Sequence, residues 1–114
     1  MTLFRAFLAV FLIVLTAYTA KVGLQYGWNI IPMFFSEMQA LTWQGQFNLD
    51  FMGFLLLSAI WCIWRNNYSP AGWGLSIFAA TGGMMFLTIY LLYLSITTGG
   101  DIKAIMLGEQ RAAA

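Results

Sequence analysis

The amino-acid sequence predicts an all-α integral membrane protein with three transmembrane helices and one short interfacial amphipathic helix. Of the 114 residues, 61% are hydrophobic and only 8% are charged, whereas a soluble domain carries roughly 25% charged residues. Three apolar stretches are long enough to cross a hydrocarbon core of ~30 Å at the helical rise of ~1.5 Å per residue. Between the first two stretches, tyrosine and tryptophan mix with amide side chains, which is typical of a membrane–water interface.

The three spans account for most of the chain, so we expect a single membrane domain over residues 1–114 with no separate soluble module. The expected parts are spans at about residues 3–24, 48–65 and 72–97, an interfacial segment at about 25–47 and a polar tail at 98–114. The third span contains no charged residue and is longer than a bilayer needs, so we expect it to tilt or protrude.

Local signals place the starts and ends of these helices. Asn48 is the expected N-cap of the second span, and Asp50 would then lie in its first turn, where a carboxylate faces the positive end of the helix dipole. In the interfacial segment, Pro32 can open a short helix and Gly45 can close it. Pro70 lies in a polar loop and indicates that the second span has already ended.

The charges exclude nucleic acid as a partner and leave the orientation weakly defined. The net charge is only +1, from five basic and four acidic residues, which provides no basic surface for a phosphate backbone. If the three spans alternate in direction, Arg5 and Arg65 lie on one side and Lys21, Lys103 and Arg111 on the other. We expect the N-terminus in the cytoplasm because Arg5 precedes the first span and Arg65 lies in a short loop.

Small residues mark two faces of the third span and predict close helix packing. A seven-residue spacing gives one narrow stripe along the whole helix, and a second group lies roughly opposite at 100° per residue. These faces either pack the three helices of one chain together or join the chain to another transmembrane subunit or to a second copy of itself. The stripe contains Gly74, Thr81, Thr88 and Ser95, and the opposite face contains Gly72, Ser76, Ala79, Ala80 and Gly83.

No group of residues predicts catalysis or a metal site. The sequence has no histidine, the commonest general base and metal ligand, and its single cysteine, Cys62, lies in an apolar run as a small hydrophobic residue would. Asp50 and Glu37 are the candidate ionisable groups for a ligand or ion, although Asp50 can equally support a helix start. Trp28 and Trp43 fit an interfacial belt, or an apolar pocket for a lipid, a quinone or a carotenoid.

The second and third spans resemble a pattern found in small bacterial inner-membrane protein families of unknown function. The similar stretch covers roughly residues 48–93, with NLDFMGFLLLSAIWCIWRNN followed by a short loop and WGLSIFAATGGMMFLTIYLLY. The chain has Asn66 and Asn67 where those families often have an acidic residue. The resemblance implies a bacterial inner, or plasma, membrane location and carries over no catalytic residue. The matching positions are Asp50, Gly53, Trp61, Trp64, Arg65, Gly82 or Gly83, and Tyr90.

Two functions follow from these observations as hypotheses. The first is a non-catalytic accessory or assembly subunit of a larger respiratory or photosynthetic membrane complex, held by the small-residue faces. The alternative is a homo-oligomeric protein that binds or transports a small molecule or lipid and uses Asp50 or Glu37. An enzyme is disfavoured because each carboxylate lacks a positioned partner.

Overall fold

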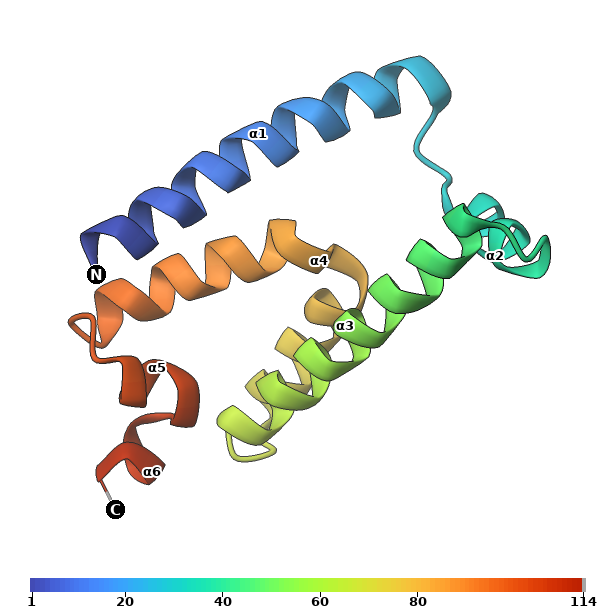
Figure 1. The fold of residues 1–114 in the computed structure, drawn as a ribbon. Coiled ribbons are helices and arrows are strands. Elements are labelled where there is room, and N and C mark those ends of the chain that lie inside the picture. The colour runs from blue at the N-terminus through green and yellow to red at the C-terminus, as the bar shows by residue number, and fades with distance from the viewer. Residues whose placement is uncertain (114) are drawn as a thin grey trace.

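The computed structural model describes residues 1–113 and confirms the predicted all-α class (Figure 1). Three of its helices are long and apolar enough to span a membrane: α1 (Thr2–Tyr26), α3 (Trp43–Arg65) and α4 (Pro70–Thr97). Three shorter helices accompany them in the described part of the chain, namely α2 (Ile31–Gln39), α5 (Ile102–Leu107) and α6 (Glu109–Ala113). The chain is therefore a multi-pass membrane protein by the length and composition of its helices.

The chain turns from α1 into α2 at a glycine. Gly27 has a φ of 89°, which L side chains rarely adopt, and it stops α1. Trp28 folds back onto Gly23, where an added Cβ would overlap the indole ring. Pro32 occupies the first turn of α2, where its missing N–H costs nothing, as the sequence predicted.

The second long helix begins five residues earlier than predicted. Its N-cap is Thr42, whose Oγ1 accepts a hydrogen bond from the Gly45 backbone N–H at 3.1 Å. Asn48 is therefore not the cap, and its side chain instead donates to the Phe34 carbonyl oxygen at 3.1 Å. Gly45 does not close α2 either: it lies buried in the first turn of α3, against the Glu37 backbone carbonyl. Asp50 consequently lies about two turns into α3 rather than at its start.

Helices α3 and α4 form a tight antiparallel hairpin. Asn67 and Tyr68 adopt positive φ angles of 56° and 58° in the connecting turn, and the Ser69 hydroxyl then caps α4 by accepting from the Gly72 N–H at 3.1 Å. A Cβ on Gly72 would lie 3.5 Å from the Cys62 carbonyl oxygen, so the two backbones are close. Cys62 is fully buried, the environment of a small hydrophobic residue.

The third long helix is broken in its middle. Gly83 has φ 57° and ψ −140°, a non-helical conformation that essentially only glycine adopts without strain. Figure 1 shows α4 changing direction sharply at this point, so that the helix consists of a first half, residues 70–82, and a second half, residues 84–97. The rings of Phe78 and Phe86 stack across the break with their centroids 6.3 Å apart.

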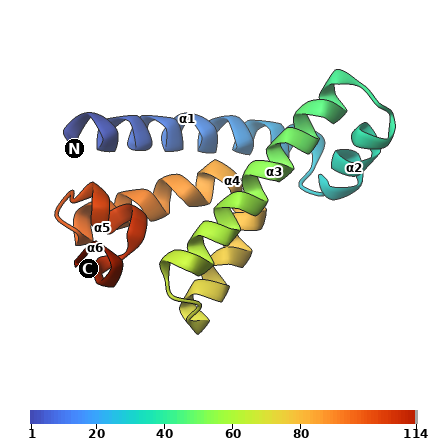
Figure 2. The same cartoon turned by 60° about the horizontal axis from the view of Figure 1, so that its bottom comes forward.

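The two halves of α4 lie inside a larger V made by the other two long helices. The first half of α4 packs along α3, and the second half packs along α1. Figures 1 and 2 both show α1 and α3 converging near α2 and diverging toward the chain termini. Helices α5 and α6 lie at the open end of the V. The main buried cluster is at the same end and contains Cys62, Ala79, Tyr90, Leu94 and Ile105.

Candidate functional site: the cleft of the broken helix

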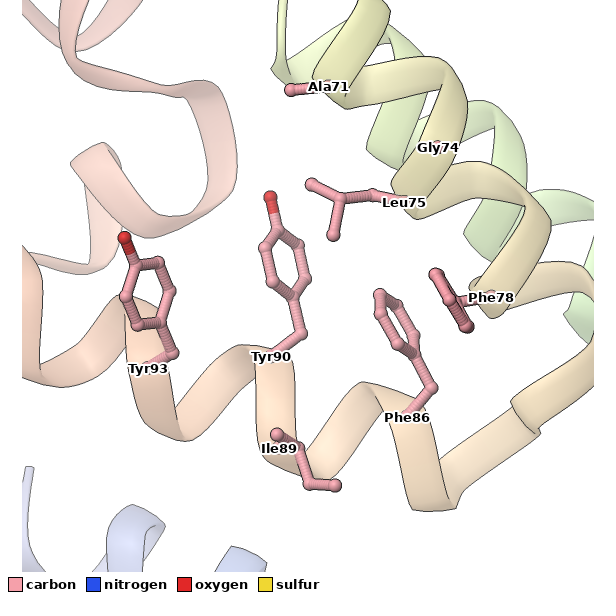
Figure 3. Close-up of a pocket in the computed structure, with 8 residues that line it drawn as sticks. All are labelled: Ala71, Gly74, Leu75, Phe78, Phe86, Ile89, Tyr90 and Tyr93. Carbon is pink, nitrogen blue, oxygen red and sulfur yellow. The ribbon is translucent and has the colours of Figure 1, made fainter.

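The break in α4 creates an apolar cleft between the two halves of the helix. Its volume is about 620 Å³, within the range of small-molecule sites. Figure 3 shows side chains from the two halves lining it from opposite sides, with the hydroxyls of Tyr90 and Tyr93 pointing away from the second-half backbone. The first half contributes Ala71, Gly74, Leu75 and Phe78, and the second half contributes Phe86, Ile89, Tyr90 and Tyr93.

A polar cavity of about 530 Å³ adjoins this apolar cleft. The two share Ala71, Leu75, Tyr90 and Tyr93 as lining residues, so they form one amphipathic space, which we call the α4 cleft. The polar part lies at the open end of the V, next to α6. Its other lining residues are Arg65, Asn66, Asn67, Leu94, Thr97, Thr98, Gly108, Glu109 and Gln110.

A row of aromatic rings runs along one side of the cleft. The Phe86 ring stacks on Tyr90 with a centroid distance of 5.5 Å and an interplanar angle of 20°. Trp61 of α3 meets the edge of the Tyr90 ring at 5.8 Å. Because such pairs are worth roughly 0.5–1.5 kcal/mol beyond area burial, they fix the orientation of Tyr90, which is only 6% exposed.

The Tyr90 hydroxyl lies where the apolar and polar parts meet, and it is held by two donors. The Asn66 side-chain amide donates to its oxygen at 2.9 Å, and the Arg65 guanidinium donates at 3.4 Å. A phenol has one O–H to donate in addition to its acceptor lone pairs. Within residues 1–113, this hydroxyl donates to no protein acceptor. The arrangement therefore leaves an oriented O–H donor at the boundary of the cleft.

Arg65 supports this donor from the end of α3. Although charged, it is only 9% exposed, and its Nε and NH2 groups donate to the carbonyl oxygens of Ile105 and Ala104 at 2.6 and 3.1 Å. These carbonyls belong to the last turn of α5, the negative end of a helix dipole, where a cation is favoured. Burial of an arginine is tolerable because its fixed donors are satisfied.

The chain after α4 is held against the end of α3 by further contacts. The Trp61 indole N–H donates to the Met106 carbonyl oxygen at 2.9 Å. Arg111 donates to the Trp64 carbonyl oxygen at 2.6 Å and lies 4.1 Å above the Trp64 ring. Gly108 has a φ of 85° and lies close to the backbone at the end of α3, since a Cβ there would be 2.9 Å from the Arg65 carbonyl oxygen. The polar tail is thus a wall of the site.

The four residues predicted to bind a ligand or ion lie outside the α4 cleft. Asp50 is exposed on α3, and Glu37 lies at the α2–α3 corner, where it accepts from the Thr42 hydroxyl at 3.4 Å. Trp28 and Trp43 are 63% and 77% exposed near α2. None of the four lines either part of the α4 cleft.

The small residues of α4 pack largely within the chain. Gly72, Ser76 and Ala79 are buried in the first half of α4, which packs on α3, and Ala80 is half-buried. The predicted stripe does not run along one continuous helix, because the break at Gly83 divides it. Gly74 lines the cleft and Thr81 is exposed, whereas Thr88 and Ser95 are fully buried in the second half.

The sequence reasoning missed the cleft because it treated the third span as one straight helix. The available signal was the Gly82–Gly83 pair in mid-span, since glycine is a recognised cause of sharp kinks. The sequence pointed to Tyr90 only through the family resemblance, and to Arg65 through that resemblance and the orientation argument, not as part of a binding site. No local pattern pointed to Gln110 or to the rest of the tail as lining residues.

Comparison of the chain with protein-family models, with curated proteins and with solved structures finds no match. The chemistry of the site must therefore be argued from the geometry of the chain itself. Among residues 1–113, no three histidine, cysteine, aspartate or glutamate side chains group closely enough to hold a metal ion.

Proposed function

We propose that this protein binds an amphipathic membrane molecule in the α4 cleft. The observation that carries the proposal is the continuity of an apolar space and a polar space through the shared residues Tyr90 and Tyr93. Ligand sites typically combine apolar walls with a few placed polar groups that fix orientation. The hypothesis of a protein that binds a small molecule or lipid is kept, but the proposed binding site is now the α4 cleft and not Asp50 or Glu37.

The ligand that fits the cleft has an oxygen acceptor next to an apolar body. The Tyr90 O–H is the donor for that oxygen, because Asn66 and Arg65 already occupy the acceptor side of the hydroxyl. The apolar body would lie between the two halves of α4, beside the stacked rings of Phe78 and Phe86. A quinone carbonyl and the ester oxygen of a glycerolipid both provide this chemistry.

Filling the cleft tests the proposal without breaking the fold. A Cβ added to Gly74 would meet nothing within 4 Å, so Gly74→Leu puts a side chain into the cleft. Gly53→Leu is the matched control, since Gly53 lies on a long helix with equally open space but does not line the cleft. The readouts are photolabelling by a photoreactive quinone, photolabelling by a photoreactive glycerophospholipid, and thermal stability.

We expect Gly74→Leu to reduce labelling by one of the two probes at least tenfold while Gly53→Leu leaves it unchanged. The probe that loses labelling identifies the source of the acceptor oxygen. Equal labelling of both variants by both probes, at unchanged stability, would contradict ligand binding in the α4 cleft.

A second candidate function is the accessory or assembly subunit, and the packing of α1 favours it. Only Leu8 and Gly23 are buried on this long helix, and its other apolar side chains are largely exposed. A face of α1 that includes Leu3, Phe7 and Val10 forms a shallow apolar groove that suits a transmembrane helix of another subunit or of a second copy. Native mass spectrometry after mild extraction tests this: a chain that is monomeric in every detergent and nanodisc contradicts it.

The location that we propose is the bacterial inner membrane, with the N-terminus in the cytoplasm. The resemblance over residues 48–93 supports the bacterial assignment, and the position of Arg5 before the first long helix supports the orientation. Fractionation of expressing bacteria tests the location, because the chain should remain in the inner-membrane fraction after washing with high salt.

A further inference from the structure

The two ends of α4 lie on the same side of the molecule as the start of α1. Arg5, near the start of α1, donates to the Ser95 carbonyl oxygen at 2.7 Å and to the Ser95 hydroxyl at 3.1 Å. A Cβ on Gly100 would lie 3.0 Å from the Met1 side chain. The N-terminus and the end of α4 are therefore neighbours, as Figures 1 and 2 both show.

The end of α3 lies on this side as well. Arg65, the last residue of α3, contacts the carbonyls of Ala104 and Ile105 after α4. If α1, α3 and α4 crossed the membrane in alternating directions, the residues after α4 would lie on the surface opposite Arg5 and Arg65. The two surfaces are ~30 Å apart, so these hydrogen bonds exclude that alternation while α1 and α3 both cross.

The break at Gly83 gives α4 the geometry of a helix that enters and returns. Each half contains 13 or 14 residues, about 20 Å at ~1.5 Å per residue, which is too short to cross alone. Irregular backbone at membrane depth is tolerated where protein covers it. Gly83 is covered in this way by α3, since a Cβ there would lie 2.9 Å from the Phe51 ring and 3.6 Å from Leu55.

The basic residues agree with this topology. If the spans alternate, two basic residues lie on one side of the membrane and three on the other, and this difference is too small to define an orientation. With α4 returning, Arg5, Arg65, Lys103 and Arg111 all lie on one side, and only Lys21, near the far end of α1, lies on the other. Four of the five basic residues then flank the membrane on a single surface, as the positive-inside rule expects of a cytoplasmic surface.

We propose that α4 is a re-entrant helical hairpin that enters from and returns to the cytoplasmic surface, and that the polar part of the α4 cleft lies at that surface. The part concerning the cleft rests on the proposed function, whereas the topology does not. The polar part of the cleft is lined by Arg65, Thr98 and Gln110, which all lie at this surface, and the apolar part extends toward Gly83. A bound amphiphile would then keep its polar end near the cytoplasmic surface and its apolar end toward Gly83.

Labelling of single cysteines tests the topology without any ligand. In a chain carrying Cys62→Ala, the exposed residues Thr2, Gln39 and Lys103 are each replaced by cysteine. A membrane-impermeant maleimide is then applied to right-side-out and to inverted vesicles from expressing cells. The Cys62→Ala chain without an added cysteine gives the background.

We expect Thr2→Cys and Lys103→Cys to be labelled in inverted vesicles and Gln39→Cys in right-side-out vesicles. Labelling of Lys103→Cys from the same side as Gln39→Cys would show that α4 crosses and would overturn the hairpin. Labelling of all three from one side would overturn it too, because α1 would not cross. Labelling of Thr2→Cys and Lys103→Cys only in right-side-out vesicles would overturn the cytoplasmic assignment. The effect of Gly74→Leu on probe binding does not depend on any of these outcomes. The proposed binding site and the proposed topology can therefore be contradicted separately.

Discussion

The Arg65 Nε lies 2.6 Å from the Ile105 carbonyl oxygen and so joins the end of α3 to a short helix forty residues later in the chain. The same guanidinium reaches Ala104 and the Tyr90 hydroxyl. One side chain thereby connects α3, the second half of α4 and α5, and it places the tail against the cleft.

Replacing Arg65 with lysine should detach the tail. An ammonium group is a point charge on a flexible stem and cannot reproduce the fixed donor fork of arginine. Since hydrogen bonds to charged groups contribute about 1.5–3 kcal/mol each, we expect Arg65→Lys to lower stability by roughly 2 kcal/mol or more. Trypsin should then cut faster after Lys103 and Arg111 in the tail.

Lys103→Gln is the control for stability, because Lys103 is exposed on α5 and its removal should leave the thermal midpoint unchanged. An Arg65→Lys chain that melts and is digested like the wild type would contradict the role of Arg65 in holding the tail.

Replacing Gly83 with alanine should destabilise the chain through the backbone. A non-glycine residue in a sparsely populated backbone region costs about 1–3 kcal/mol, and the new Cβ would also press on the Phe51 ring at 2.9 Å. The matched control is Gly53→Ala, where helical geometry and open space predict a change from zero to a gain of about 1 kcal/mol. Equal unfolding midpoints for the two variants in thermal denaturation would show that the break does not depend on glycine.

The break at Gly83 also marks the limit of what the sequence predicts. Composition and the length of the apolar runs are enough to predict three long membrane helices, because lipid tolerates little else. The pair Gly82–Gly83 fits two structures equally well, a straight helix with a small-residue face and a helix that reverses. Contacts between distant segments distinguish them, such as the contact of Arg5 with Ser95, and a pair separated by ninety residues leaves no local pattern.

The helix starts show the same limit on a smaller scale. Asn48 and Thr42 are both good N-cap residues, and the sequence alone does not decide between them. Packing decides, because Gly45 allows the first turn of α3 to approach the backbone of Glu37. The additional turns move Asp50 away from the helix start. Asp50 therefore no longer faces the positive end of the helix dipole.

Replacing Tyr90 with phenylalanine should weaken ligand binding. The variant keeps the ring that stacks on Phe86 but loses the O–H that would donate to the ligand. One such hydrogen bond contributes about 1–1.5 kcal/mol, so we expect roughly tenfold weaker binding of the probe that labels the α4 cleft. Tyr93→Phe is the control, since Tyr93 lines the same cleft but is 60% exposed. If both variants bind the probe like the wild type in a titration, Tyr90 is not the donor.

Replacing Arg5 should loosen α1 from the second half of α4, and Ser95→Ala should do so less. Arg5→Gln removes both hydrogen bonds to Ser95, whereas Ser95→Ala removes the 3.1 Å bond to the hydroxyl and keeps the 2.7 Å bond to the carbonyl. Because the Ser95 hydroxyl also donates to the Leu92 carbonyl at 2.8 Å, its loss still carries some cost, of about 1 kcal/mol. We expect hydrogen exchange across residues 84–97 to rise more in Arg5→Gln than in Ser95→Ala, and to rise in the double variant by less than the sum of the two single changes, because both remove the 3.1 Å bond. Additive increases in the double variant would mean that the two side chains act independently, and the contact that places the N-terminus beside the end of α4 would lose its support.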